Sequence, residues 1–157
     1  MRVLKFGGSS LASAERFIQV ADIIKEISEE SSVAVVVSAP HGVTNHLVAM
    51  AENISDEEKL ETDLGHFKYA IDTIIDDLSA SLPSFNRQHA EQALANHEHQ
   101  LSRYMKGATM LSYCPDHIRA RIISTGERLS VAILESVLQS SGEEVSLLAP
   151  EKFLYTN

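Results

Sequence analysis

Lys5-Phe6-Gly7-Gly8-Ser9-Ser10 separates two segments of different character, and together with them it decides the fold class of this chain. The preceding Arg2-Val3-Leu4 has the apolar character of a buried strand, whereas residues 13–28 carry apolar side chains at helical spacing. Two glycines allow a sharp turn and a close approach of the backbone to a ligand, because no Cβ is in the way. The free N–H groups of a following helix attract negative groups. The stretch therefore predicts a turn that suits phosphate, although many α/β proteins turn this way for purely structural reasons.

A second strand is expected directly after the first helix. Val33-Ala34-Val35-Val36-Val37 is apolar on both faces, as expected for a central parallel strand that is covered on both sides. Strand, helix and strand in this order form a βαβ unit. Near the end of the chain Gly142 is expected to end a helix, and Val145-Ser146-Leu147-Leu148 predicts a third strand. The predicted fold class is therefore α/β with a parallel sheet.

The middle of the chain, about residues 53–110, has the pattern of two long helices. Ser55-Asp56-Glu57-Glu58 has the spacing of a capping box at the start of the first helix, and Pro83 separates the two. Two such helices around a short loop predict an antiparallel hairpin inserted into the α/β domain. The histidines of this insertion lack the spacing of metal ligands, and two of them point to different faces of one helix. They are His66, His89, His97 and His99, the last two being the pair on different faces. We therefore predict no metal site.

Composition and charge exclude several classes of function. The chain has 157 residues, of which 44% are apolar and 22% charged, as in an ordinary globular domain. Its net charge of −9, with scattered basic residues, argues against binding to nucleic acid or to an anionic membrane. The longest apolar run, residues 33–37, is far too short to span a bilayer. The single cysteine, Cys114, is expected to be a small buried residue. One cysteine allows no disulfide within the chain, and the N-terminus has no signal-like segment, so we expect a cytoplasmic protein.

Two further polar clusters follow predicted elements of the α/β part. Ser38-Ala39-Pro40-His41-Gly42-Val43-Thr44-Asn45 comes after the second strand, the place where open α/β sheets bind ligands. On local grounds the structural explanation is favoured for both residues: Thr44 as the N-cap of the next helix, and Ser38 as a strand-end hydroxyl. Ser124-Thr125-Gly126-Glu127-Arg128 interrupts or begins a helix later in the chain. The absence of Walker-type and Gly-x-Gly-x-x-Gly patterns excludes the commonest nucleotide fingerprints.

The three clusters together resemble the motifs of the aspartate kinases. Residues 5–10 are similar to the opening Lys-Phe-Gly-Gly-Thr-Ser of that family, with Ser9 in place of threonine. Residues 38–45 are similar to the second motif, and residues 125–130 to the third. The motifs occur in the order of the family, and the resemblance covers essentially the whole chain. The helical insertion is most similar to that of the bifunctional aspartokinase/homoserine dehydrogenases.

The resemblance implies an amino-acid kinase type of αβα sandwich and a phosphoryl transfer. In this family the γ-phosphoryl group of ATP, bound with Mg²⁺, passes to the side-chain carboxylate of L-aspartate. Such a reaction depends on positioning and on neutralisation of charge. By resemblance, Lys5 is the catalytic residue that neutralises charge on the phosphoryl group, and Gly7, Gly8 and Ser9 hold the phosphates.

On the substrate side, the resemblance implies that the hydroxyls of Ser38 and Thr44 hold the carboxylates of aspartate. Glu127 faces the α-ammonium group of the substrate in this interpretation, because an ammonium group calls for a carboxylate partner. The structural alternative for Glu127 is a solvated carboxylate at the start of a helix. The resemblance assigns no residue of this chain to a metal.

The resemblance also implies that residues 1–157 are the N-terminal part of a longer catalytic domain. The nucleotide lobe, the regulatory ACT domains and any dehydrogenase domain come later in members of the family, which are homo-oligomers. We therefore expect little kinase activity from this chain alone. Two alternatives stay open: a kinase of another small acid, such as glutamate or N-acetylglutamate, and a non-catalytic module that binds amino acids or a protein partner.

Overall fold

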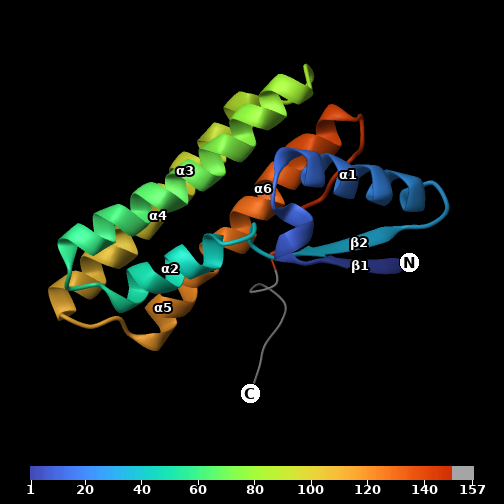
Figure 1. The fold of residues 1–157 in the computed structure, drawn as a ribbon. Helices are drawn as coiled ribbons and strands as arrows, with labels where there is room; N and C mark the ends of the chain where they lie inside the picture. Colours follow the sequence, from blue (N-terminus) through green and yellow to red (C-terminus); the bar gives the residue numbers. More distant parts are fainter. Residues whose placement is uncertain (150–157) are drawn as a thin grey trace.

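The computed structural model describes residues 1–149, which form a βαβ unit beside a bundle of helices (Figure 1). Residues 150–157 of the predicted domain lie outside the described residues. In chain order the elements are β1 (Arg2–Phe6), the 3-10 turn η1 (Gly8–Leu11), α1 (Ala14–Ser28), β2 (Val33–Val37), α2 (Val43–Glu52), α3 (Glu57–Ser81), α4 (Arg87–Leu111), α5 (Asp116–Ile123) and α6 (Thr125–Ser140). No helix within residues 1–149 has the length and apolar character needed to cross a membrane.

The predicted βαβ unit is confirmed at the start of the chain. β1 and β2 run parallel, with Lys5 opposite Val36 in the register. α1 begins where Ser13 caps it, since the Ser13 Oγ accepts a hydrogen bond from the Arg16 N–H at 3.4 Å. The face of α1 that carries Phe17, which is 0% exposed, packs into the core between the sheet and the helices.

The two faces of this small sheet differ in burial. Leu4 and Phe6 on β1, with Val35 and Val37 on β2, pack against the core. The opposite face was predicted to be covered as well, but Val36 is 50% exposed there, since no described segment packs over it. Within residues 1–149 the sheet is therefore covered on one side only.

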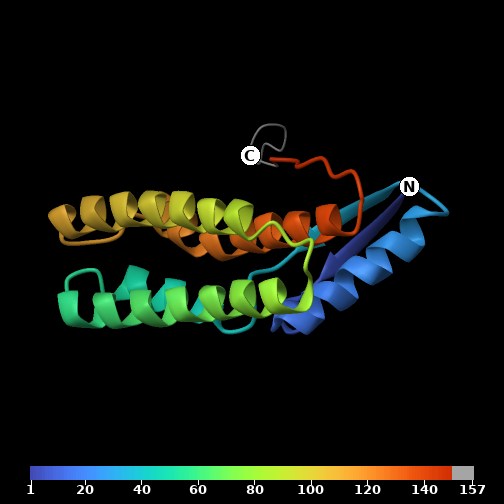
Figure 2. The same ribbon diagram turned by 90° about the horizontal axis from the view of Figure 1, so that it is seen from above.

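The predicted helical insertion is confirmed, and its two long helices pack into two layers (Figure 2). α3 packs mainly along α2, whereas α4 packs mainly along α6. Each helix of the insertion therefore contacts a different helix of the rest of the fold. The cap of α3 lies one residue later than the predicted Ser55: the Asp56 carboxylate accepts from the Lys59 N–H at 3.2 Å. A carboxylate at this position satisfies a free N–H and also favours the positive end of the helix.

The end of the described chain contradicts one prediction. α6 ends at Ser140, and Gly142 follows with a φ of +84°, as predicted for a helix stop. The Glu143 N–H donates to the Leu138 carbonyl and the Gly142 N–H to the Gln139 carbonyl, which is the Schellman pattern. Residues 145–148, however, form no strand, because no described strand pairs with them.

Candidate functional site

Polar segments leave both strands at the same edge of the sheet. The Ser38 N–H donates to the Phe6 carbonyl at 3.0 Å, so β1 and β2 end side by side. From this edge η1 follows β1, and the loop of residues 38–42 leads from β2 into α2 (Figure 1). The carboxyl ends of parallel strands are where α/β folds place ligand-binding loops.

The glycine turn is held against the loop that follows β2. A Cβ on Gly8 would lie 3.0 Å from the Ala39 carbonyl oxygen and 3.7 Å from the His41 Cα. Both neighbours are backbone atoms, which a side chain cannot push aside without a backbone shift. Lys5 and Ser9 are exposed at the same end of β1. Packing against this loop therefore favours glycine at position 8 by itself.

Thr44 lies inside α2 and does not cap it, contrary to the prediction. The cap position is taken by Gly42, whose φ of +82° is in the left-handed region that favours glycine. The Val43 N–H donates to the Pro40 carbonyl at 3.1 Å, which closes the turn before the helix. Thr44 is therefore in the first turn of α2, half-buried, with no capping role to explain its hydroxyl.

The third cluster reaches the same loop from α6. A Cβ on Gly126 would lie 2.6 Å from the Ala39 Cβ, 3.2 Å from the Val43 Cγ1 and 3.3 Å from the Leu47 Cδ1. Gly126 thus allows the first turn of α6 to lie directly on the loop and on α2. Ala39, which is 3% exposed, is the common neighbour of Gly8 and Gly126. The structure brings the three predicted motifs together around this residue.

The carboxylate of Glu127 is the unusual group of this region. Its Oε2 atom is buried, yet no described residue forms a hydrogen bond to it. The Ser130 Oγ, one turn further along α6, is also buried without a partner in the described part of the chain. A buried carboxylate oxygen without a partner costs free energy, so such a group calls for an external donor.

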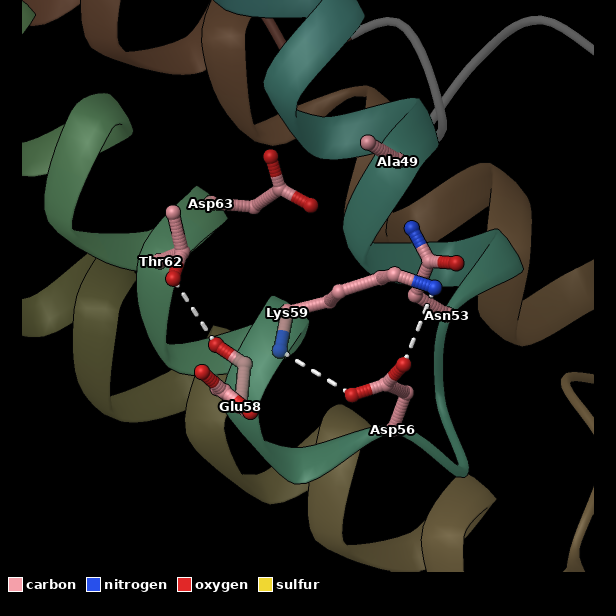
Figure 3. Close-up of a pocket in the computed structure, with 7 residues that line it drawn as sticks. All are labelled: Ala49, Asn53, Asp56, Glu58, Lys59, Thr62 and Asp63. Atoms are coloured by element: carbon pink, nitrogen blue, oxygen red, sulfur yellow. Dashed lines mark hydrogen bonds and ion pairs between the residues drawn. The ribbon is translucent and has the colours of Figure 1, made fainter.

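Two open clefts lie away from the three motifs. One is lined by Gln100, Arg103 and Tyr104 on α4. The other, with a volume of about 500 Å³, lies between α2 and α3, and Figure 3 shows its lining side chains. These are Ala49, Asn53, Asp56, Glu58, Lys59, Thr62 and Asp63. In this cleft the Lys59 ammonium group pairs with the Asp56 carboxylate at 3.0 Å, which offsets its charge.

The histidines of the insertion differ from one another in their surroundings. His97 is half-buried and His99 exposed, as predicted for residues on different faces of α4. Burial, assisted by the nearby charge of Arg128, lowers the pKa of His97 below its ordinary value. His66 was predicted to lack the spacing of a metal ligand within the insertion; the structure places it beside His46 of α2 and Asp63 of α3. The sequence signal for this group was Asp63-x-x-His66, which places both side chains on one face of a helix.

Cys114 is a half-buried thiol that packs against the core, in agreement with its predicted structural role. Burial raises the pKa of the Cys114 thiol above its ordinary value. Since the thiolate is the nucleophilic form, this environment does not activate the sulfur.

A family model described as the amino acid kinase family matches residues 1–155. The chain belongs to the amino acid kinase family. Among curated relatives, a bifunctional aspartokinase/homoserine dehydrogenase of Buchnera aphidicola is 39% identical over 155 residues, which are 98% of this chain and 19% of that protein. The predicted resemblance to aspartate kinases is confirmed by this kinship.

Solved structures of other amino acid kinases agree. Escherichia coli aspartokinase III in complex with lysine and aspartate has a TM-score of 0.71 and 28% identity, over 92% of this chain and 30% of that chain. The same enzyme in complex with aspartate and ADP has a TM-score of 0.69 and 28% identity, over 90% of this chain and 29% of that one. The predicted α/β fold of the amino-acid kinase type is thereby confirmed. The chain spans between a fifth and a third of the lengths of these relatives.

Proposed function

We propose that this chain supplies the aspartate-binding part of an aspartate kinase. The reaction is the ATP-dependent phosphorylation of the side-chain carboxylate of L-aspartate to 4-phospho-L-aspartate, which starts the pathway to lysine, threonine and methionine. Family membership and the names of the relatives support this reaction. The observation that carries the proposal is the buried Oε2 of Glu127, which has no partner among the described residues and follows Gly126, the residue that packs on the loop after β2.

The α-ammonium group of aspartate is the donor that Glu127 lacks. A buried carboxylate is costly alone, but an ammonium group supplies both opposite charge and hydrogen bonds. A substrate with an α-ammonium group therefore completes this part of the site. The position of Glu127 in the first turn of α6, held onto the loop by Gly126, keeps the carboxylate in place before the substrate arrives.

The carboxylates of the substrate are held by Ser38 and Thr44 in this proposal. Both residues are half-buried, and both have hydroxyl donors. Thr44 is in the first turn of α2, where free N–H groups and the helix dipole favour a negative group. Two acceptor groups on the substrate are thus matched by donors from the β2 end and from α2.

The phosphate side of the site is formed by Gly7, Gly8, Ser9 and Lys5. In η1 the Ser10 N–H is the first to bond within the turn, to the Gly7 carbonyl at 2.9 Å, which leaves the N–H groups of Gly8 and Ser9 ahead of it for a phosphate. The exposed ammonium group of Lys5 and the hydroxyl of Ser9 add charge and a donor at the same place. These residues fit the triphosphate group of a nucleotide. Bound ATP, with its Mg²⁺, supplies the phosphoryl group. The chain's own residues orient it and neutralise its charge.

We infer that residues 1–157 are the N-terminal part of the catalytic domain and that the remainder of the site lies on further chain. The exposed sheet face around Val3 and Val36, 66% and 50% exposed, is too apolar for a free surface of a parallel sheet. The share of the relatives' length that this chain covers supports the same inference. Little kinase activity is expected from the chain alone, and a homo-oligomer is expected for the complete enzyme.

The decisive experiment is steady-state kinetics of the complete enzyme that carries this chain, with Glu127→Gln and the control Glu26→Gln, an exposed site on α1. Loss of this half-buried charge partner should lower kcat/KM for aspartate at least about 30-fold, mainly through KM. The control should match the unsubstituted enzyme. An unchanged kcat/KM in Glu127→Gln would refute the assignment, and preference for L-glutamate over L-aspartate would favour another amino-acid kinase.

A further inference from the structure

Three metal-ligating side chains from two helices meet on the surface of the helical bundle. His46 comes from α2, and Asp63 and His66 come from α3. One ligand atom from each lies within 4.8 Å of the others, and the His46 Nδ1 is 3.9 Å from the Asp63 Oδ1. The two imidazole rings have centroids 5.4 Å apart. Tertiary packing produces this group, because His46 and Asp63 are far apart in the sequence.

The helices beneath the group are well packed. α2 and α3 pack closely along one another, and Leu47, Met50 and Phe67 are 0% exposed at their contact with the core. Asp63 and His66 are three residues apart, so they lie on the same face of α3. Sites whose ligands come from packed helices hold their geometry better than sites on loops.

The donor set selects the metal. Imidazole nitrogen suits Zn²⁺, Cu²⁺ and Ni²⁺, whereas Mg²⁺ and Ca²⁺ take oxygen ligands almost exclusively. Two histidines and one carboxylate are a frequent set for Zn²⁺ with one position left for water. Around a tetrahedral zinc the ligand atoms lie about 3.3 Å apart, since each is about 2.0 Å from the metal. The present separations, 3.9 Å between the His46 Nδ1 and the Asp63 Oδ1 and at most 4.8 Å within the group, are longer than this value, so the three side chains have to close in around a bound metal.

We propose that His46, Asp63 and His66 bind a zinc-class divalent transition metal that ties α2 to α3. The site is separate from the proposed aspartate site. Thr44 and His46 are two residues apart on α2, which turns their side chains about 200° from one another around the helix axis. The contact of His46 with Asp63 shows that His46 faces α3, so the metal acts on the helix that carries Thr44 from its other side.

The surroundings of the site fit a cation. Asp63 also lines the cleft between α2 and α3, where Figure 3 shows its carboxylate above the chain of Lys59. The Lys59 ammonium group pairs with the Asp56 carboxylate at 3.0 Å, which reduces its electrostatic repulsion of a bound metal ion. The side chain of Asp63 is 18% exposed and that of His46 33% exposed, so both are partly desolvated, which strengthens their interaction with a metal.

The test is a titration of this chain with Zn²⁺ by calorimetry, repeated with Co²⁺ to read its visible absorption. We expect one metal per chain, the absorption of four-coordinate cobalt, and a rise in unfolding temperature of about 5–10 °C at a hundredfold excess over Kd. His46→Gln, His66→Gln and Asp63→Asn should each weaken binding at least about tenfold, because each removes a ligand. The control His99→Gln, an exposed histidine of α4, should leave Kd unchanged.

A Kd for Zn²⁺ weaker than about 1 mM, or an unchanged Kd in the His46→Gln/His66→Gln double variant, overturns the proposal. Equal loss of affinity in His99→Gln overturns it as well, because that result means adventitious binding to surface histidines. A Zn²⁺ titration of the unsubstituted chain, followed by the NMR signals of the imidazole rings, tests the site even if a variant does not fold. Zn²⁺ must shift the rings of His46 and His66 and leave that of His99 in place.

Discussion

Substitution of Gly126 by alanine tests whether α6 is packed as tightly on the β2–α2 loop as the structure indicates. The new Cβ would lie 2.6 Å from the Ala39 Cβ, about 1 Å inside the best carbon–carbon separation. Two further carbons, on Val43 and Leu47, would lie at 3.2 and 3.3 Å. Ala39 has no flexible end that can move away, so the backbone of α6 or of the loop has to shift.

The expected cost follows from two opposing terms. Overpacking in a buried contact destabilises by about 1–3 kcal/mol. Alanine in place of glycine in a helix stabilises by at most about 1 kcal/mol. We therefore expect Gly126→Ala to lower the free energy of unfolding by about 1–2 kcal/mol, and the unfolding temperature by about 2–8 °C.

The measurement is urea and thermal unfolding followed by circular dichroism, with Gly107→Ala as the matched control. Gly107 is also in a helix, α4, but a Cβ there would meet nothing within 4 Å. This variant should gain about 0.5–1 kcal/mol. A double variant with Ala39→Gly should restore part of the loss in Gly126→Ala, since it removes the closest atom. If Gly126→Ala is as stable as Gly107→Ala, the reasoning about this contact is wrong.

Three other outcomes are expected. Burial and the charge of Arg128 lower the pKa of His97, so His97 binds a proton more tightly in the unfolded chain than in the folded one. The unfolding temperature should therefore fall as the pH drops below about 6.5, and it should fall less in His97→Gln. Hydrogen bonds with Lys59 lower the pKa of Asp56, so the contribution of this carboxylate to stability is complete above the unfolded value of 3.8 and is lost as the pH falls further. Between about pH 5 and pH 2 the unfolding temperature of Asp56→Asn should therefore fall less than that of the unsubstituted chain. Gly142→Ala should lower the free energy of unfolding in urea by about 1 kcal/mol, because the φ of +84° strains an L-residue. A stability equal to that of the unsubstituted chain would contradict the role of Gly142 in the Schellman motif that ends α6.

Local signals predicted the elements well and their partners poorly. The apolar period of residues 13–28, the β-branched run of β2 and the stop at Gly142 are properties of short segments, and the structure agrees with all three. The predicted strand at 145–148 is wrong because a strand exists only when another strand pairs with it, which a short apolar run does not specify. Likewise Thr44 has the right chemistry for an N-cap, but the left-handed backbone at Gly42 starts α2 earlier.

The sequence by itself determined the βαβ start, the helical insertion and the three motifs that resemble aspartate kinases, because each depends on residues adjacent in the chain. Only the tertiary structure decided that Gly8 and Gly126 meet at Ala39, that the Glu127 Oε2 is buried without a partner among residues 1–149, and that His46 faces Asp63 and His66. These contacts join residues far apart in the sequence. They arise from the packing of whole helices, where burial of apolar faces fixes which polar groups come together.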